Sequence, residues 1–109
     1  MTQQEKDLQI AHSIKQKVEK KLKDNLISIT FYGSRANGTG RKDSDLDLFV
    51  LVKNKPKLGS IGDETIIQIT TQYLNQENML ITPVVYDLKT YQKYKNLSYL
   101  KEVRKGIKL

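Results

Sequence analysis

The sequence contains no cysteine and no tryptophan, only two prolines and one histidine, and no long run of apolar residues. Without cysteine, the chain has neither a disulfide framework nor a thiolate zinc site. No stretch approaches the roughly 18 consecutive apolar residues of a membrane-spanning helix, and the first ten residues lack the basic region and apolar run of a secretory signal. These absences predict a soluble protein of the reducing cytoplasm with no membrane partner.

Acidic residues are also under-represented, with 12 Asp and Glu against 19 Lys and Arg and a formal net charge of +7. Part of the positive charge lies in one stretch that contains Lys15, Lys17, Lys20, Lys21 and Lys23. A basic surface attracts nucleic acid, nucleotides or an acidic protein, but such lysines usually form the solvated face of a helix. The charge therefore identifies no partner by itself. The length of 109 residues favours a single domain over residues 1–109.

Two long helices are predicted from capping signals and from apolar residues three or four places apart. The first covers residues 2–23, where Thr2 and Glu5 have the spacing of a capping box. The second begins after Ser60, has Asp63 in its first turn, and carries apolar residues as far as Leu74. Both helices have one apolar face that must be covered by another layer.

Three segments rich in β-branched and apolar residues are predicted as strands, at 26–32, 45–52 and 79–86. Pro83 places the third strand at a sheet edge or interrupts it, because proline donates no ladder hydrogen bond. Asp87 and Ser98 are expected to cap short helices, and Gly106 fits a helix C-terminus. This order predicts an α/β (α+β) fold, a small mixed sheet with helices packed mainly on one face.

Asp45 and Asp47 begin the second predicted strand and are the candidate catalytic and metal-binding residues. Residues i and i+2 of a strand point to the same face, about 7 Å apart along the chain. Two carboxylates there repel each other, and Mg²⁺ relieves that repulsion because it binds one or two carboxylates together with substrate phosphates. Leu46 and Leu48 alternate with the aspartates and point toward the core.

Gly33 and Ser34 follow the first predicted strand and are candidate nucleotide-binding residues, together with Arg35 and Arg41. Glycine allows the backbone to approach a phosphate closely, and a following turn or short helix would aim N–H groups at it. The Ser34 hydroxyl adds a donor, and the two arginines offset triphosphate charge. With Asp45 and Asp47, these residues suit phosphoryl or nucleotidyl transfer, in which positioning and charge neutralisation supply most of the catalysis.

Residues 33–50, GSRANGTGRKDSDLDLFV, resemble the minimal nucleotidyltransferase domains of the DNA polymerase β superfamily. The family signature is G-S, ten residues and D-x-D, which stands here as GSRANG followed by SDLDL. The resemblance implies that Gly33 and Ser34 hold ATP or another NTP, and that Asp45 and Asp47 bind catalytic Mg²⁺. It also implies transfer of an NMP, foremost AMP, to a protein or small acceptor with release of pyrophosphate. Many minimal members are antitoxins of a HEPN-domain toxin, and some silence that toxin by adding AMP to it.

The chain departs from the family pattern at two places. Asn37 stands where the family has a second loop arginine, and residues 82–85 lack the third carboxylate that the family carries on a later strand. Asp87 lies just past that strand and could supply the missing carboxylate only if the strand end curls toward the site, whereas the cap of a helix is its simpler role. Three functions therefore stay open: an active transferase, a regulatory protein that neutralises a partner by binding, and a basic nucleic-acid binder that the charge alone supports. An exposed edge strand would also be compatible with a homodimer.

Overall fold

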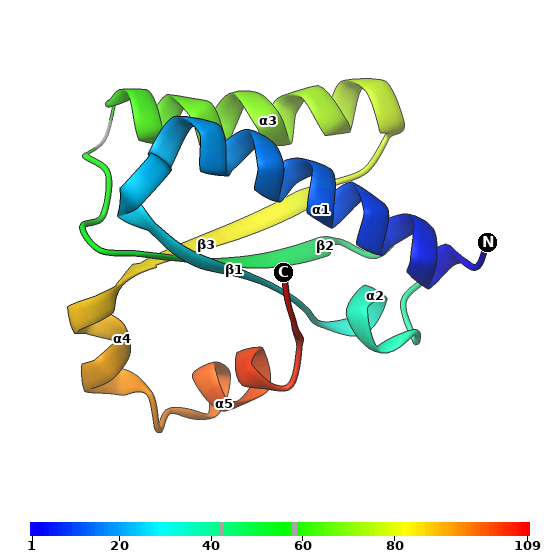
Figure 1. The fold of residues 1–109 in the computed structure, drawn as a ribbon. Helices are drawn as coiled ribbons and strands as arrows, with labels where there is room; N and C mark the ends of the chain where they lie inside the picture. Colours follow the sequence, from blue (N-terminus) through cyan, green and yellow to red (C-terminus); the bar gives the residue numbers. More distant parts are fainter. Residues whose placement is uncertain (42, 58) are drawn as a thin grey trace.

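The computed structural model describes residues 1–41, 43–57 and 59–109, and arranges four strands of this part of the chain in one mixed sheet (Figure 1). The strands are β1 (Leu26–Tyr32), β2 (Leu46–Val52), β3 (Ile81–Asp87) and β4 (Ile107–Lys108), in the order β3-β2-β1-β4. β1 is antiparallel to both β2 and β4, whereas β2 and β3 are parallel. A parallel pair needs a crossover, which α3 (Ile61–Glu77) supplies.

Helices cover both faces of the sheet, with the longer ones on one side (Figure 1). α1 (Gln3–Leu22) and α3 lie together on one face, and a 3-10 turn (Lys23–Asn25) leads from α1 into β1. The short helices α4 (Leu88–Tyr94) and α5 (Ser98–Arg104) cover the opposite face. α2 (Ser34–Asn37) lies at the end of β1. The predicted α/β class with a mixed sheet is therefore confirmed.

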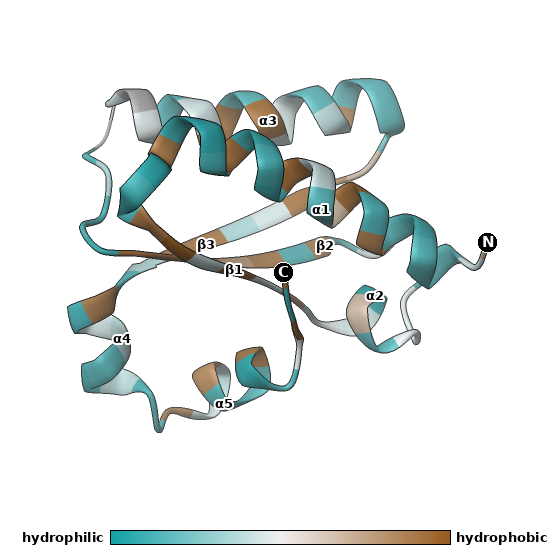
Figure 2. Cartoon of the chain, viewed as in Figure 1, coloured by the Kyte–Doolittle hydropathy of each residue, from teal (hydrophilic) through white to brown (hydrophobic). Residues whose placement is uncertain are grey.

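The sheet separates two hydrophobic clusters, and β2 contributes to both. Leu48 and Val50 belong to the cluster under α1 and α3, while Phe49 and Leu51 join Leu100 of α5 and its neighbours on the other face. β2 is thus buried on both faces, which explains why its sequence is apolar without alternation. In Figure 2, hydrophobic residues recur along the strands, and hydrophilic residues occupy much of α1.

Several local predictions are confirmed by hydrogen bonds. Thr2 and Glu5 form the capping box of α1, with the Thr2 hydroxyl accepting the Glu5 N–H. Ser60 caps α3 by accepting the Asp63 N–H at 3.3 Å. β3 lies at the edge of the sheet, as Pro83 predicts. No helix in the described ranges combines the length and hydropathy needed to cross a membrane.

One local prediction at the C-terminal end is wrong, and one strand there was not predicted. Ser98 does not cap α5: it is the first helical residue, the N-cap is Leu97, and no side chain caps this helix. Gly106 follows the end of α5 as expected, but it leads directly into β4, a strand that the sequence did not predict. A strand of two residues carries too little pattern to be recognised, because only its pairing with Thr30 and Phe31 defines it.

Candidate active site

The two candidate carboxylates lie where β2 begins, on the face of the sheet covered by α4 and α5. Asp47 shares this face with Phe49 because side chains alternate along a strand. Asp45 directly precedes the strand and is exposed, whereas Asp47 is half-buried. Burial, and then the charge of Asp45, raises the pKa of the Asp47 carboxyl. Keeping both groups ionised therefore costs free energy that a bound cation would recover.

Gly33 forms the turn that faces Asp47. Its backbone has φ 84° and ψ −166°, a combination that is essentially confined to glycine. A Cβ at Gly33 would overlap Oδ2 of Asp47 and lie 3.3 Å from its Cγ. The preceding residue, Tyr32, is the ladder partner of Asp47, so the end of β1 holds the turn against the carboxylate. The motif glycine is thus required by the conformation of the turn and by the space that Asp47 occupies.

Ser34 begins α2 directly after this turn. Its carbonyl oxygen accepts the N–H groups of Thr39 at 3.0 Å and Gly40 at 2.9 Å, which closes the loop after α2. A Cβ at Gly40 would come within 2.8 Å of the Arg35 backbone nitrogen, so the loop folds tightly onto the start of the helix. The structure therefore brings Gly33 and Ser34 to the same end of the sheet as the aspartate pair.

Thr82 joins the aspartate pair from β3. It is the ladder partner of Asp47, and its hydroxyl donates a hydrogen bond of 3.2 Å to Oδ2 of Asp45. Two carboxylates and a hydroxyl form an all-oxygen donor set, the ligand chemistry that Mg²⁺ prefers, so these residues fit the metal. Within the described ranges, no cluster of three or more His, Cys, Asp or Glu side chains is arranged to hold a metal ion. The sequence missed Thr82 because its importance depends on the register between β2 and β3.

Asp87 does not supply the third carboxylate. Its ladder partner is Val52 at the opposite end of β2 from Asp47, a separation of about 16 Å at the usual rise of a strand. Its carboxylate accepts the Thr90 N–H at 2.6 Å and caps α4. Those hydrogen bonds lower the pKa of Asp87. The alternative site role that the sequence left open for Asp87 is therefore wrong, and the capping role is confirmed.

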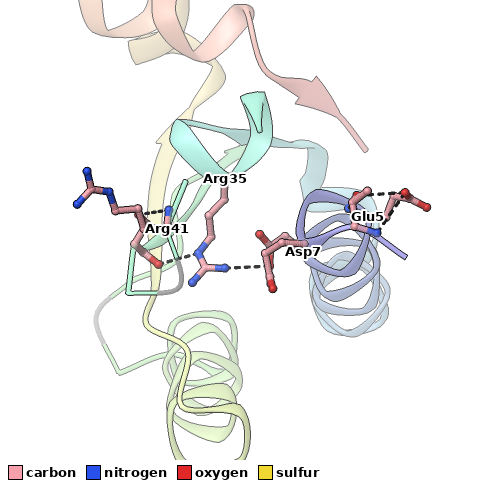
Figure 3. A network of polar contacts seen from close by, with 7 residues as sticks. Glu5, Asp7, Arg35 and Arg41 are labelled. Atoms are coloured by element: carbon pink, nitrogen blue, oxygen red, sulfur yellow. Dashed lines mark hydrogen bonds and ion pairs between the residues drawn. The ribbon is translucent and has the colours of Figure 1, made fainter. Parts of the chain in front are cut away.

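Arg35 is a structural residue of the site rather than an exposed phosphate ligand. Its side chain is buried, its Nη1 lies 2.9 Å from Oδ1 of Asp7 in α1, and its Nε donates to the Ser44 carbonyl at 2.7 Å. Figure 3 shows the guanidinium extending between α1 and the loop before β2. Gln3 also donates to Asp7, at 2.9 Å. The expectation that Arg35 offsets triphosphate charge therefore differs from its observed placement, in which it secures the loop that leads to Asp45.

Arg41 is exposed, and its side chain points away from Arg35 (Figure 3). It borders a cavity of about 550 Å³, which also touches Asp43, Ser44 and Asp45. The Ser44 hydroxyl accepts the Arg41 backbone N–H at 2.9 Å and fixes the base of this side chain. Arg41 thus remains available to a negatively charged ligand beside Asp45.

Tyr32 and Tyr99 contact each other beside Asp47. The hydroxyls of Tyr32 and Tyr99 are 2.8 Å apart, and their rings meet edge to face with centroids 6.0 Å apart. Burial raises the pKa of Tyr32, and the hydrogen bond with Tyr99 and the charge of Asp47 add to this effect. Tyr99 also packs against Phe49, as expected for a tyrosine of a helix that covers the sheet. Both phenols are consequently neutral at neutral pH, and either one can donate the hydrogen bond between them.

Comparisons with known proteins show the family of the chain. Residues 12–108 match the sequence model of the family described as "Nucleotidyltransferase domain". A protein of Methanocaldococcus jannaschii named "Putative protein adenylyltransferase" is 33% identical over 79 residues, which make up 72% of this chain and 78% of that protein. A second protein with this name from the same organism is 35% identical over 72 residues, 66% of this chain, and the chain spans only 49% of its length.

A solved structure of a mutant toxin–antitoxin pair, MntA-HpeT, is 17% identical, with a TM-score of 0.49 over 74% of this chain and 58% of that chain. At that level of likeness, the structure assigns nothing to this chain. The family match, in contrast, extends over all four strands and includes the four motif positions, Gly33, Ser34, Asp45 and Asp47. The chain therefore belongs to the nucleotidyltransferase domain family.

Proposed function

We propose that this nucleotidyltransferase domain moves a nucleoside monophosphate, AMP in the first instance, from a Mg²⁺-bound NTP to a hydroxyl group of a protein or small acceptor. One observation carries the proposal: Asp45 and Asp47 meet at the end of the sheet, with the backbone of Gly33 against Asp47. The two relatives named as protein adenylyltransferases support ATP as the donor and a protein as the acceptor.

Each residue at the end of the sheet has a defined task in this reaction. Asp45 and Asp47 would hold the metal, and the Thr82 hydroxyl orients the Asp45 carboxylate. Gly33 lets the turn lie directly against Asp47, because the place that a Cβ would take is filled by the Asp47 carboxylate. Mg²⁺, when bound, neutralises the charge of the triphosphate and of the departing pyrophosphate. The chain contributes orientation and charge, since such a transfer needs no covalent help from the protein.

A label-transfer experiment tests this proposal. The chain is incubated with Mg²⁺ and ATP that is labelled either on the α-phosphate or on the γ-phosphate, with candidate protein acceptors present. We expect the acceptor to retain the α label and not the γ label, and the variant with Asp45→Asn and Asp47→Asn to transfer neither. Transfer of the γ label would indicate a kinase, and equal transfer by the variant would exclude the aspartate pair.

A second function, neutralisation of a partner by binding alone, is favoured by the incomplete set of carboxylates. Thr82 occupies the position beside Asp47, and Asp87 lies at the far end of the sheet. By the family resemblance, the partner would be a HEPN-domain toxin. If the variant with Asp45→Asn and Asp47→Asn still neutralises such a toxin, masking is sufficient; if neutralisation is lost in a folded variant, it depends on catalysis. Either role is proposed for the cytoplasm, where ATP is abundant.

A further inference from the structure

A second cavity borders the turn that faces Asp47. It has a volume of about 390 Å³ and is lined by Gly33 and Asn37 on one side and by Lys105 and Gly106 on the other. This volume is within the range of about 300–1,000 Å³ that is typical of small-molecule sites. Because Gly33 also contacts Asp47, the cavity begins where the carboxylate site ends. A triphosphate whose α-phosphate lies at the aspartates would extend its tail into this space.

The tail of a triphosphate needs a cation there, and the arginines of the loop lie elsewhere. Arg35 is buried against Asp7, and Arg41 borders the other cavity beside Asp45. Lys105 is the cationic side chain among the described residues that line the cavity at Gly33. An ammonium group with three donors is well suited to the β- and γ-phosphates, where charge matters more than planar geometry.

The backbone holds Lys105 in this position. The next residue, Gly106, lies so close to β1 that a Cβ would come within 2.5 Å of the Phe31 carbonyl oxygen and 2.7 Å of the Tyr32 Cβ. β4 then pairs with β1, with Ile107 opposite Phe31. The end of α5 is thus fixed against the last residues of β1, directly before Gly33.

The side chain of Lys105 is available at little cost. Its Nζ lies 2.9 Å from Oε1 of Glu102, and both side chains are largely exposed, at 73% and 66%. Exposed ion pairs of this kind contribute little to stability, so a phosphate can replace Glu102 as the partner of Lys105. The carboxylate of Glu102, which also lines the cavity, opposes the binding of a polyanion.

We propose that Lys105 binds the β- and γ-phosphates of the nucleoside triphosphate and that Glu102 competes for it, which makes the end of α5 a specificity element for triphosphates over monophosphates. This inference rests on the proposed function, because it extends the same nucleotide site. It assigns the phosphate-binding cation to the C-terminal part of the chain rather than to the loop that contains the signature motif.

Calorimetric titration of the full chain with Mg·ATP, with inorganic tripolyphosphate and Mg²⁺, with AMP, and with Mn²⁺ alone tests this assignment. We expect Lys105→Ala to weaken Mg·ATP and tripolyphosphate about tenfold and to leave AMP and Mn²⁺ binding unchanged. Glu102→Gln should strengthen the two polyphosphates. Lys101→Ala removes a lysine of the same helix that does not line the cavity, and it should bind all ligands as the parent chain does. Adding Asn37→Arg to Lys105→Ala should restore the affinity for Mg·ATP, because residue 37 borders the same cavity.

The outcomes separate this inference from the function on which it rests. If the parent chain binds Mg·ATP, the variant with Asp45→Ala and Asp47→Ala does not, and Lys105→Ala binds normally, the assignment of Lys105 is overturned and the proposed function stands. If the parent chain binds neither Mg·ATP nor tripolyphosphate, both are overturned. Equal losses for Lys101→Ala and Lys105→Ala would show that only general surface charge is involved, which also overturns the assignment.

Discussion

Replacement of Gly33 by alanine tests the geometry of the site most specifically. The backbone at Gly33, with φ 84° and ψ −166°, costs a residue with a Cβ about 2 kcal/mol, or roughly 10 °C in Tm for a domain of this size. The new methyl group would also overlap Oδ2 of Asp47. The carboxylate must therefore leave its present position at the end of the sheet, and we expect Gly33→Ala to lose most of its Mn²⁺ and Mg·ATP binding.

The matched control is Gly59→Ala. Gly59 has a similar φ of +79°, but a Cβ there would have no neighbour within 4 Å among the residues that the structure describes. This variant should lose about 1 kcal/mol of stability from backbone strain and bind Mn²⁺ as the parent chain does. Thermal melts followed by circular dichroism and calorimetric titration with Mn²⁺ measure the two effects separately. Parental Mn²⁺ affinity in folded Gly33→Ala would refute the contact with Asp47, and a loss of affinity in Gly59→Ala would show that strain alone explains the effect.

Three further predictions concern the carboxylates and the buried ion pair. The folded-state pKa of Asp47 is raised, so the ionised carboxylate destabilises the fold above that pKa, and this destabilisation disappears as the pH falls. Asp47→Asn should therefore raise the Tm of the metal-free protein at pH 7 and change it little near about pH 3. The same variant should abolish the stabilisation by MgCl₂ in the same melts. Arg35→Ala leaves the Asp7 carboxylate buried without this partner and should cost about 3–5 kcal/mol in urea denaturation, with much of the loss recovered when Asp7→Leu is added. Thr82→Asp should raise Mn²⁺ affinity about tenfold by placing a third carboxylate beside Asp47, whereas Asp87→Ala should lower the Tm and leave Mn²⁺ binding unchanged in the same titration.

The elements that the sequence predicted well depend on local signals. The capping box of Thr2 and Glu5, the cap at Ser60 and the apolar run of β1 are each encoded within a few residues, and the structure has them where they were expected. Asp87 is a cap for the same reason, since its carboxylate accepts an N–H three residues further on. The N-cap of α5 is Leu97 and not Ser98, because a serine near the start of a helix can be either the cap or the first helical residue.

The features that the sequence could not predict depend on contacts between distant segments. Arg35 meets Asp7 from another helix, so the motif alone suggested a phosphate ligand where the structure has a buried ion pair. Thr82 contacts Asp45 only because of the register of the parallel pair, and Lys105 borders the turn at Gly33 only because β4 pairs with β1. The motif therefore predicted that Gly33 and the aspartate pair meet at one end of the sheet, and tertiary packing determined which other side chains surround this candidate site.

The most direct test of the account is a calorimetric titration of the chain with ATP in the presence of Mg²⁺ and then of EDTA, beside the variant with Asp45→Ala and Asp47→Ala. The account predicts binding that requires both the metal and the two aspartates. Binding that persists in EDTA or in the folded variant, or no binding of ATP or another NTP under any condition, would contradict a working nucleotide site at the end of this sheet.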